Sequence, residues 1–168
     1  MKNMGKKGNS IMLTRDKFTF ALVCWILYLV LTLAPALSLM VKMISFGLSV
    51  DTVVYILSYM SPIANAVWMM GREDQWLWIH IAAGIFGILV LAGILIGLLK
   101  LRKQPKKWLL FLTAGGQLLM LISEVYTIHT VSLGQSFSLS DIPCSFYAML
   151  ASFAFTVSAL NNWDENRY

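Results

Sequence analysis

The sequence predicts an all-α integral membrane protein with four transmembrane helices and one further helix on the outer face, either amphipathic or re-entrant. Of the 168 residues, 58% are hydrophobic and 12% are charged, whereas soluble domains carry roughly a quarter charged residues. The charges are also clustered, and they leave uncharged runs of membrane-spanning length at 18–41, 77–99 and 142–163. These features exclude a soluble enzyme, a disordered chain and a disulfide-stapled secreted module.

The N-terminal residues 1–17 are rich in Lys and Arg and show no apolar period. We therefore expect them to form a mobile, basic cytoplasmic tail. The first span follows at 18–41, which is about 36 Å long as a helix. Ala34-Pro35-Ala36 resembles a signal-peptidase site, but the apolar run continues through Met40. An uncleaved helix with a kink at Pro35 is the preferred interpretation.

The segment 49–71 is apolar enough to be a fifth span, and the distribution of Lys and Arg decides against this. With four spans that omit the segment, eleven of the 13 Lys and Arg residues face the cytoplasm and two, Lys42 and Arg72, face outward. With five spans the division is six to seven. Because positive residues in short loops stay inside, the count favours four spans with both termini cytoplasmic.

The same segment carries a polar face. Its polar positions recur at spacings of three and four, which places them on one side of a helix. They are Asp51, Tyr55, Ser58, Pro62 and Asn65. An interfacial amphipathic helix bent at Pro62 is the preferred form, and a re-entrant hairpin covered by the bundle is the alternative.

The other spans follow from the remaining apolar runs. They are predicted at 77–99, 108–131 and 142–163, with a basic loop at 100–107 and a cytoplasmic tail at 164–168. Trp76 and Trp78 fall at the outer end of the predicted span 77–99. Amphipathic aromatic rings favour this membrane–water interface. The chain is thus expected to be a single four-span domain, 18–163, in a cell membrane.

Glu124 is the strongest candidate for chemistry, because it is the acidic residue that lies well inside a predicted span. It is about 24 Å above the inner interface, and it shares a helix face with Thr113, Gln117 and Thr127. A carboxyl on such a stripe can bind a proton or a cation, or hold a charged ligand group. The alternative is a neutral or hydrogen-bonded carboxyl that joins two helices or reaches the outer headgroups. The fourth span offers a matching polar stripe at Ser145, Ser152 and Thr156.

Small residues on the second span indicate close helix packing. Gly93 and Gly97 form a GxxxG pair, and Gly84 and Gly87 precede it by one to two turns. Small residues let helix backbones approach closely in lipid. Packing within the bundle is preferred over a dimer interface, because the pattern is common in any bundle.

The two histidines, His80 and His129, fall near the outer ends of neighbouring spans. Paired imidazoles at one depth can ligate haem b, but ordinary interfacial histidines explain the pair without a ligand. We expect no haem, no other cofactor and no metal. Cys24 and Cys144 fall in opposite halves of the membrane, so no disulfide within the chain is expected.

Nucleotide-binding, zinc-protease and hydrolase motifs are absent from the sequence, so catalysis is not favoured. The preferred function is a non-catalytic accessory or regulatory subunit of a membrane complex. The alternatives are a proton- or cation-coupled transport component that uses Glu124, and a haem b redox subunit that uses His80 and His129. Expected partners are the lipid bilayer and another membrane protein or a second copy of the chain, and not nucleic acid.

The four-span topology is tested by cysteine labelling in intact cells, in a chain whose native cysteines are replaced by serine. An impermeant thiol reagent should label Gln135→Cys and Tyr55→Cys and should leave Gln104→Cys unlabelled, because the basic loop stays inside. Labelling of Gln104→Cys with none at Gln135→Cys would overturn the predicted orientation.

Overall fold

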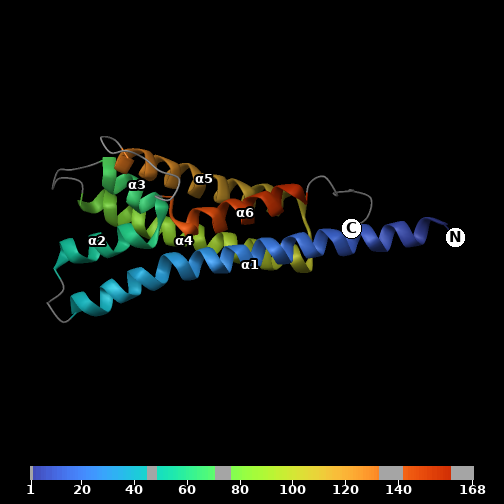
Figure 1. Cartoon of the computed structure of the whole chain (residues 1–168), viewed down its shortest axis with the longest axis horizontal. Helices are drawn as coiled ribbons and strands as arrows, with labels where there is room; N and C mark the ends of the chain where they lie inside the picture. Colours follow the sequence, from blue (N-terminus) through green and yellow to red (C-terminus); the bar gives the residue numbers. More distant parts are fainter. Residues whose placement is uncertain (1, 45–48, 71–76, 133–141, 160–168) are drawn as a thin grey trace.

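The computed structural model describes residues 2–44, 49–70, 77–132 and 142–159. Throughout these residues the regular structure is α-helix, which confirms the all-helical part of the prediction. The helices are α1 (Lys2–Ile44), α2 (Val50–Met60), α3 (Pro62–Met70), α4 (Leu77–Lys103), α5 (Lys107–Ser132) and α6 (Cys144–Ser158). Figure 1 shows that the long helices lie along one common direction.

Three of the helices are long and apolar enough to cross a membrane, namely Arg15–Met43 of α1, Trp78–Lys103 of α4 and the whole of α5. A helix satisfies its own backbone hydrogen bonds, which is the requirement that a bilayer imposes on a spanning segment. The apolar helix α6 has 15 residues, or about 22 Å of length. The predicted fourth span at 142–163 extends past Ala159, so its end lies outside the described residues.

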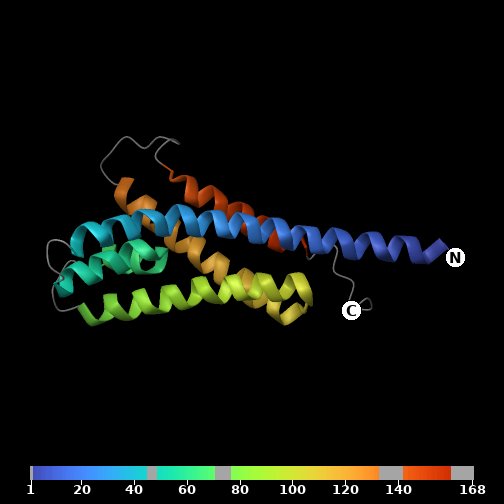
Figure 2. The same ribbon diagram turned by 90° about the horizontal axis from the view of Figure 1, so that it is seen from below.

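The helix α1 begins at Lys2 instead of Phe18. Residues 2–17, which the sequence predicts as a basic tail, continue this helix. Extending an existing helix requires no new nucleation, and Lys, Met and Arg are good helix formers. In Figures 1 and 2 the N-terminal part of α1 projects beyond the other helices.

The bundle has two distinct ends. At one end, which we call the hairpin end, α1, α3 and α5 finish and α2, α4 and α6 begin (Figure 1). At the other, the basic end, α4 meets α5 through a short connection flanked by Lys103 and Lys107. The helix α6 packs along α1. Ser152 Oγ donates to the Ala21 carbonyl at 2.7 Å, and Lys17 Nζ donates to the Ser158 carbonyl at 2.8 Å.

The main hydrophobic core lies where α1, α4, α5 and α6 meet. Trp25 and Tyr28 of α1 are fully buried there beside Leu98, Met120 and Met149. A second, smaller cluster lies nearer the basic end, around Phe18, Leu101, Leu109, Leu110 and Ala159. Large apolar side chains on the outer faces remain exposed, as expected for helices whose outer surface contacts lipid.

The helices α2 and α3 form a helical hairpin. They fold back on each other, so that the rings of Tyr55 and Trp68 meet edge to face with centroids 6.5 Å apart. The pair packs against α1, α4 and α5 (Figure 2). Residues of its polar face are buried, including Ser58 and Pro62. The segment 49–71 thus forms two helices that break at Pro62 instead of one bent helix, and residues of its polar face turn into the bundle.

Glycines of α4 allow the hairpin to approach. A Cβ at Gly84 would stand 2.9 Å from Leu57 Cβ, and a Cβ at Gly87 would overlap the side chain of Ser61. Nearer the basic end, a Cβ at Gly97 would overlap Thr113 of α5. Three of the four predicted packing glycines thus make close contacts within the bundle. A Cβ at Gly93, in contrast, would meet no described atom within 4 Å.

The contact between α4 and the hairpin is tested by adding one methyl group. Gly87→Ala should destabilise the protein by about 1–3 kcal/mol, because the new carbon overlaps Ser61 in a packed interior. Gly93→Ala makes the same chemical change in open space and should leave stability equal or slightly higher. Apparent Tm in detergent checks both variants. Equal Tm values for the two would contradict this packing.

Candidate functional site

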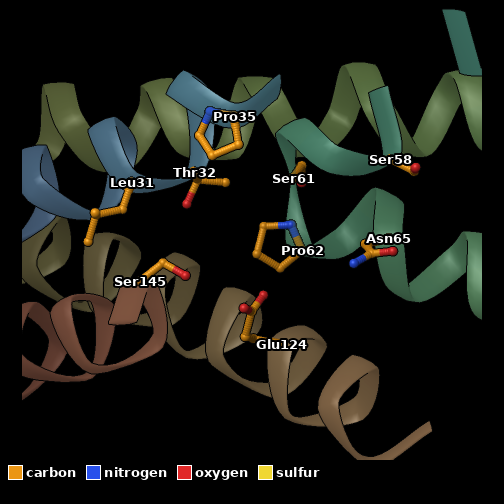
Figure 3. A pocket seen from close by; sticks show the side chains of 9 residues that line it. All are labelled: Leu31, Thr32, Pro35, Ser58, Ser61, Pro62, Asn65, Glu124 and Ser145. Atoms are coloured by element: carbon orange, nitrogen blue, oxygen red, sulfur yellow. The ribbon is translucent and has the colours of Figure 1, made fainter. Parts of the chain in front are cut away.

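A polar cavity lies beneath the tip of the helical hairpin. Its volume is about 180 Å³. Five helices (α1, α2, α3, α5 and α6) and the break between α2 and α3 contribute its lining: Leu31, Thr32, Pro35, Ser58, Ser61, Pro62, Asn65, Glu124 and Ser145. Figure 3 shows the Glu124 carboxylate pointing from α5 towards Pro62, with Thr32 and Ser145 directed into the same space. Glu124 is therefore the acidic group of a cavity that α1, α5, α6 and the hairpin share.

The helix break at the roof of the cavity follows from the sequence. Pro62 lacks an N–H and fits the first position of α3, while it forces the preceding residue into an extended conformation. Ser61 accordingly has φ −149° and ψ 133°. Ser49 begins the hairpin as an N-cap whose side chain accepts from the Thr52 N–H at 3.2 Å. Ser49 thus sets the start of α2, and Pro62 sets the break between α2 and α3.

Two of the four hydroxyl groups that line the cavity, those of Ser58 and Thr32, present acceptors to it. Ser58 Oγ donates its hydrogen to the Tyr55 carbonyl at 2.6 Å, and Thr32 Oγ1 donates to the Tyr28 carbonyl at 2.9 Å. With their hydrogens used, both oxygens keep lone pairs. Ser61 is 1% exposed, and its Oγ has no partner among the described residues. A buried hydroxyl without a partner is costly, and this one lies against Gly87 of α4.

Glu124 lies in the third of α5 nearest the hairpin end, about 12 Å from Ser132. The side chain is half-buried, and within the described parts of the chain its carboxylate has no hydrogen bond or ion pair. The nearly fully buried phenol of Tyr28 is close enough to interact with it electrostatically. Among the residues that the structure describes, no cation pairs with the carboxylate that faces the cavity.

The rest of the predicted stripe on α5 turns into the bundle. Thr113, Gln117 and Thr127 are all buried. Gln117 Nε2 donates to Ser152 Oγ at 2.9 Å, so the polar stripes predicted on the third and fourth spans do meet. Thr113 and Thr127 instead donate to carbonyls of their own helix. Gln117 thus joins α5 to α6, whereas Glu124 lines the cavity.

The two histidines have different surroundings. His80 is buried, and its ring stands 5.1 Å from that of Trp68, while its Nδ1 has no partner among the described residues. His129 is exposed on α5. Among the described residues, no group of three or more His, Cys, Asp or Glu side chains is placed to hold a metal ion.

Sequence reasoning missed several contributors to the cavity. Thr32 and Pro35 lie inside an apolar run, and Ser61 stands outside the three-and-four spacing of the segment that contains it. Ser58, Pro62 and Asn65, which the spacing places on one polar face, all line the cavity. The available signal was the Ser61-Pro62 pair in the middle of an apolar segment, which indicates a helix break.

Comparison of the chain with protein-family models, with curated proteins and with solved structures finds no match. Functional inference consequently depends on the residues of the cavity and on their chemistry.

The link between α5 and α6 is tested by a double-mutant cycle. Ser152→Ala removes the acceptor of Gln117 and the donor to Ala21, and it should cost about 1 kcal/mol of stability. The double variant Gln117→Leu, Ser152→Ala should lose less than the sum of the two single changes, because no buried amide is left unpaired. Ser158→Ala, whose hydroxyl bonds only within α6, is the control and should be neutral. Strict additivity would contradict the bond.

Proposed function

We propose that the protein binds a proton or a small monovalent cation at Glu124 and acts as a cation-coupled transport component of the membrane. The observation that carries the proposal is the position of the Glu124 carboxylate in a polar cavity of about 180 Å³ beneath a helix break. Ionisable side chains inside membrane bundles are costly, and they commonly mark ion pathways and proton relays.

The lining of the cavity selects for positive charge. The Ser58 and Thr32 hydroxyls offer lone pairs, because their hydrogens are already donated. The carbonyl groups in the last turn of α2 lack partners within that helix. Broken helices in transporters use such carbonyls to coordinate cations near a binding site. An anion would meet the Glu124 carboxylate and these acceptors without a described cationic side chain in the lining.

The proposal includes a placement in the membrane. α1, α4, α5 and α6 are the four spans, both termini are cytoplasmic, and the helical hairpin enters the bilayer from the outer side. Irregular backbone at membrane depth is tolerated where it lines a cavity, which supports a re-entrant hairpin. The site is then open to the outer half of the membrane.

An accessory role and cation binding are compatible, since a subunit that carries this site could couple ions for a larger membrane complex. The accessory subunit therefore stays a prediction. The haem alternative gains no support from the surroundings of the two histidines, because His80 packs against Trp68 while His129 is exposed.

Carbodiimide labelling tests the binding step. N,N′-dicyclohexylcarbodiimide modifies protonated carboxyls in apolar surroundings, and mass spectrometry identifies the modified peptide. In proteoliposomes Glu124 should be modified, the reaction should fall as pH rises, and Glu124→Gln should abolish it. If the ligand is a metal cation or a small ammonium, NaCl, KCl or methylammonium chloride should protect the site. Absence of modification at every pH, with no effect of these salts, would contradict the proposal.

Substitution of Glu124 separates ion coupling from structure. Gln keeps the shape and hydrogen-bonding capacity of the side chain but removes the titratable proton, whereas Ala removes both. Glu124→Gln should fold and insert normally and should lose cation-dependent or proton-dependent flux in proteoliposomes with a trapped pH dye. If Glu124 only joins helices, Gln should be tolerated and Ala should loosen the bundle. Normal flux and normal stability for Glu124→Ala would exclude both roles.

A further inference from the structure

An apolar groove separate from the Glu124 cavity runs along the outer surface where α4 and α5 meet. Its volume is about 410 Å³, within the range of about 300–1,000 Å³ that is typical of small-molecule sites. Gly93 of α4 and Gly115 of α5 lie in it beside Phe111 and Leu112. Phe111 and Leu112 are exposed, so the groove opens at the outer surface of the bundle.

Two of the three glycines that line the groove, Gly93 and Gly115, have no packing reason within the described part of the chain. A Cβ at Gly93 or Gly115 would meet nothing within 4 Å. Glycine in a helix interior is about 1 kcal/mol less favourable than alanine. Gly97 and Gly116, in contrast, make close contacts with the neighbouring helix and so have a role in packing. The open space at Gly93 and Gly115 is available to a molecule outside the bundle.

Basic side chains gather at the basic end of the bundle, and one of them, Lys100, lies on the α4 face that carries the groove. Lys100 is seven residues after Gly93, close to two full turns, so it lies on the same face of α4. Lys100, Arg102, Lys103 and Lys106 are exposed at the basic end, and the sequence has no acidic residue between Asp74 and Glu124. Trp108 precedes Gly115 by the same seven residues and is also exposed. A basic cluster with an interfacial tryptophan is suited to a lipid phosphate.

We propose that this groove is a binding site for an anionic phospholipid, with one acyl chain over Gly93 and Gly115 and the phosphate at the basic cluster. A second copy of the chain is a poorer occupant. A two-fold axis along the membrane normal would place the same groove of both copies together and bring the two basic clusters to one level. Like charges would then repel, whereas a lipid phosphate neutralises them.

Lipid retention tests the proposal. Protein purified in dodecyl maltoside is incubated with dioleoylphosphatidylglycerol or dioleoylphosphatidylcholine, and bound lipid is measured by mass spectrometry after gel filtration. The phosphatidylglycerol should remain bound in stoichiometric amount and the phosphatidylcholine should not. Gly93→Leu, which fills the groove from an open position, should abolish retention. Lys100→Gln should weaken the apparent affinity about fivefold, as expected for one basic residue near a phosphate.

Matched controls keep the outcome interpretable. Ala154→Leu adds similar bulk at an exposed position of α6 and should retain phosphatidylglycerol like the unaltered protein. Equal retention of both lipids, or unchanged retention in both Gly93→Leu and Lys100→Gln, would overturn the proposal. A dimer of the unaltered protein that Gly93→Leu dissociates would assign the groove to a second copy instead. Because Glu124 is unchanged in all variants, these results do not depend on the cation site.

Discussion

The close approach of α4 to the helical hairpin is the contact on which the rest of the structure depends. Gly87 lies directly against Ser61, where a side chain on α4 would overlap that serine. Gly84 makes a similar contact with Leu57 one turn away. This packing holds the break between α2 and α3 inside the bundle instead of at its surface. The cavity exists because the tip of the hairpin lies over α5 at the level of Glu124 (Figure 3).

The helix break and the Glu124 carboxylate both require polar surroundings, and they share one cavity. A break leaves backbone groups without helical partners, and such groups are tolerated at membrane depth where they line a polar cavity. A carboxylate without a protein partner likewise needs polar surroundings. The hydroxyls of Ser58 and Thr32, whose hydrogens are already donated, add acceptors to the lining. This chemistry is the basis on which we propose that Glu124 binds a proton or a small cation.

Hydropathy predicted the long helices because a spanning segment must be apolar along its whole length. The polar stripe on α5 was also readable, since its spacing predicts one helix face, and Gln117 does reach Ser152. The same spacing in 49–71 leaves an interfacial helix and a re-entrant hairpin open, because an amphipathic pattern is identical whether its polar side meets water or a cavity. Only tertiary packing decides between these two cases.

Other features had no sequence signal of their own. Thr32 bonds to its own helix, so a single threonine in an apolar run gives no indication that it borders a cavity. The helical start of α1 at Lys2 depends on extension from a long apolar segment, and the composition of residues 1–17 does not reveal it. Gly93 was grouped with Gly97 by spacing, although only Gly97 contacts a neighbouring helix in the described residues.

The position of the hairpin tip is measured most directly by cross-linking in native membranes. Cysteines are placed at Ser61 and Glu124, with both native cysteines replaced by serine, and a short bifunctional thiol reagent is added. An efficient cross-link within one chain is expected for this pair, and none when the first cysteine is placed at Met70, the exposed end of α3. A cysteine at position 61 that fails to cross-link and reacts fully with an impermeant thiol reagent would contradict this position of the hairpin tip.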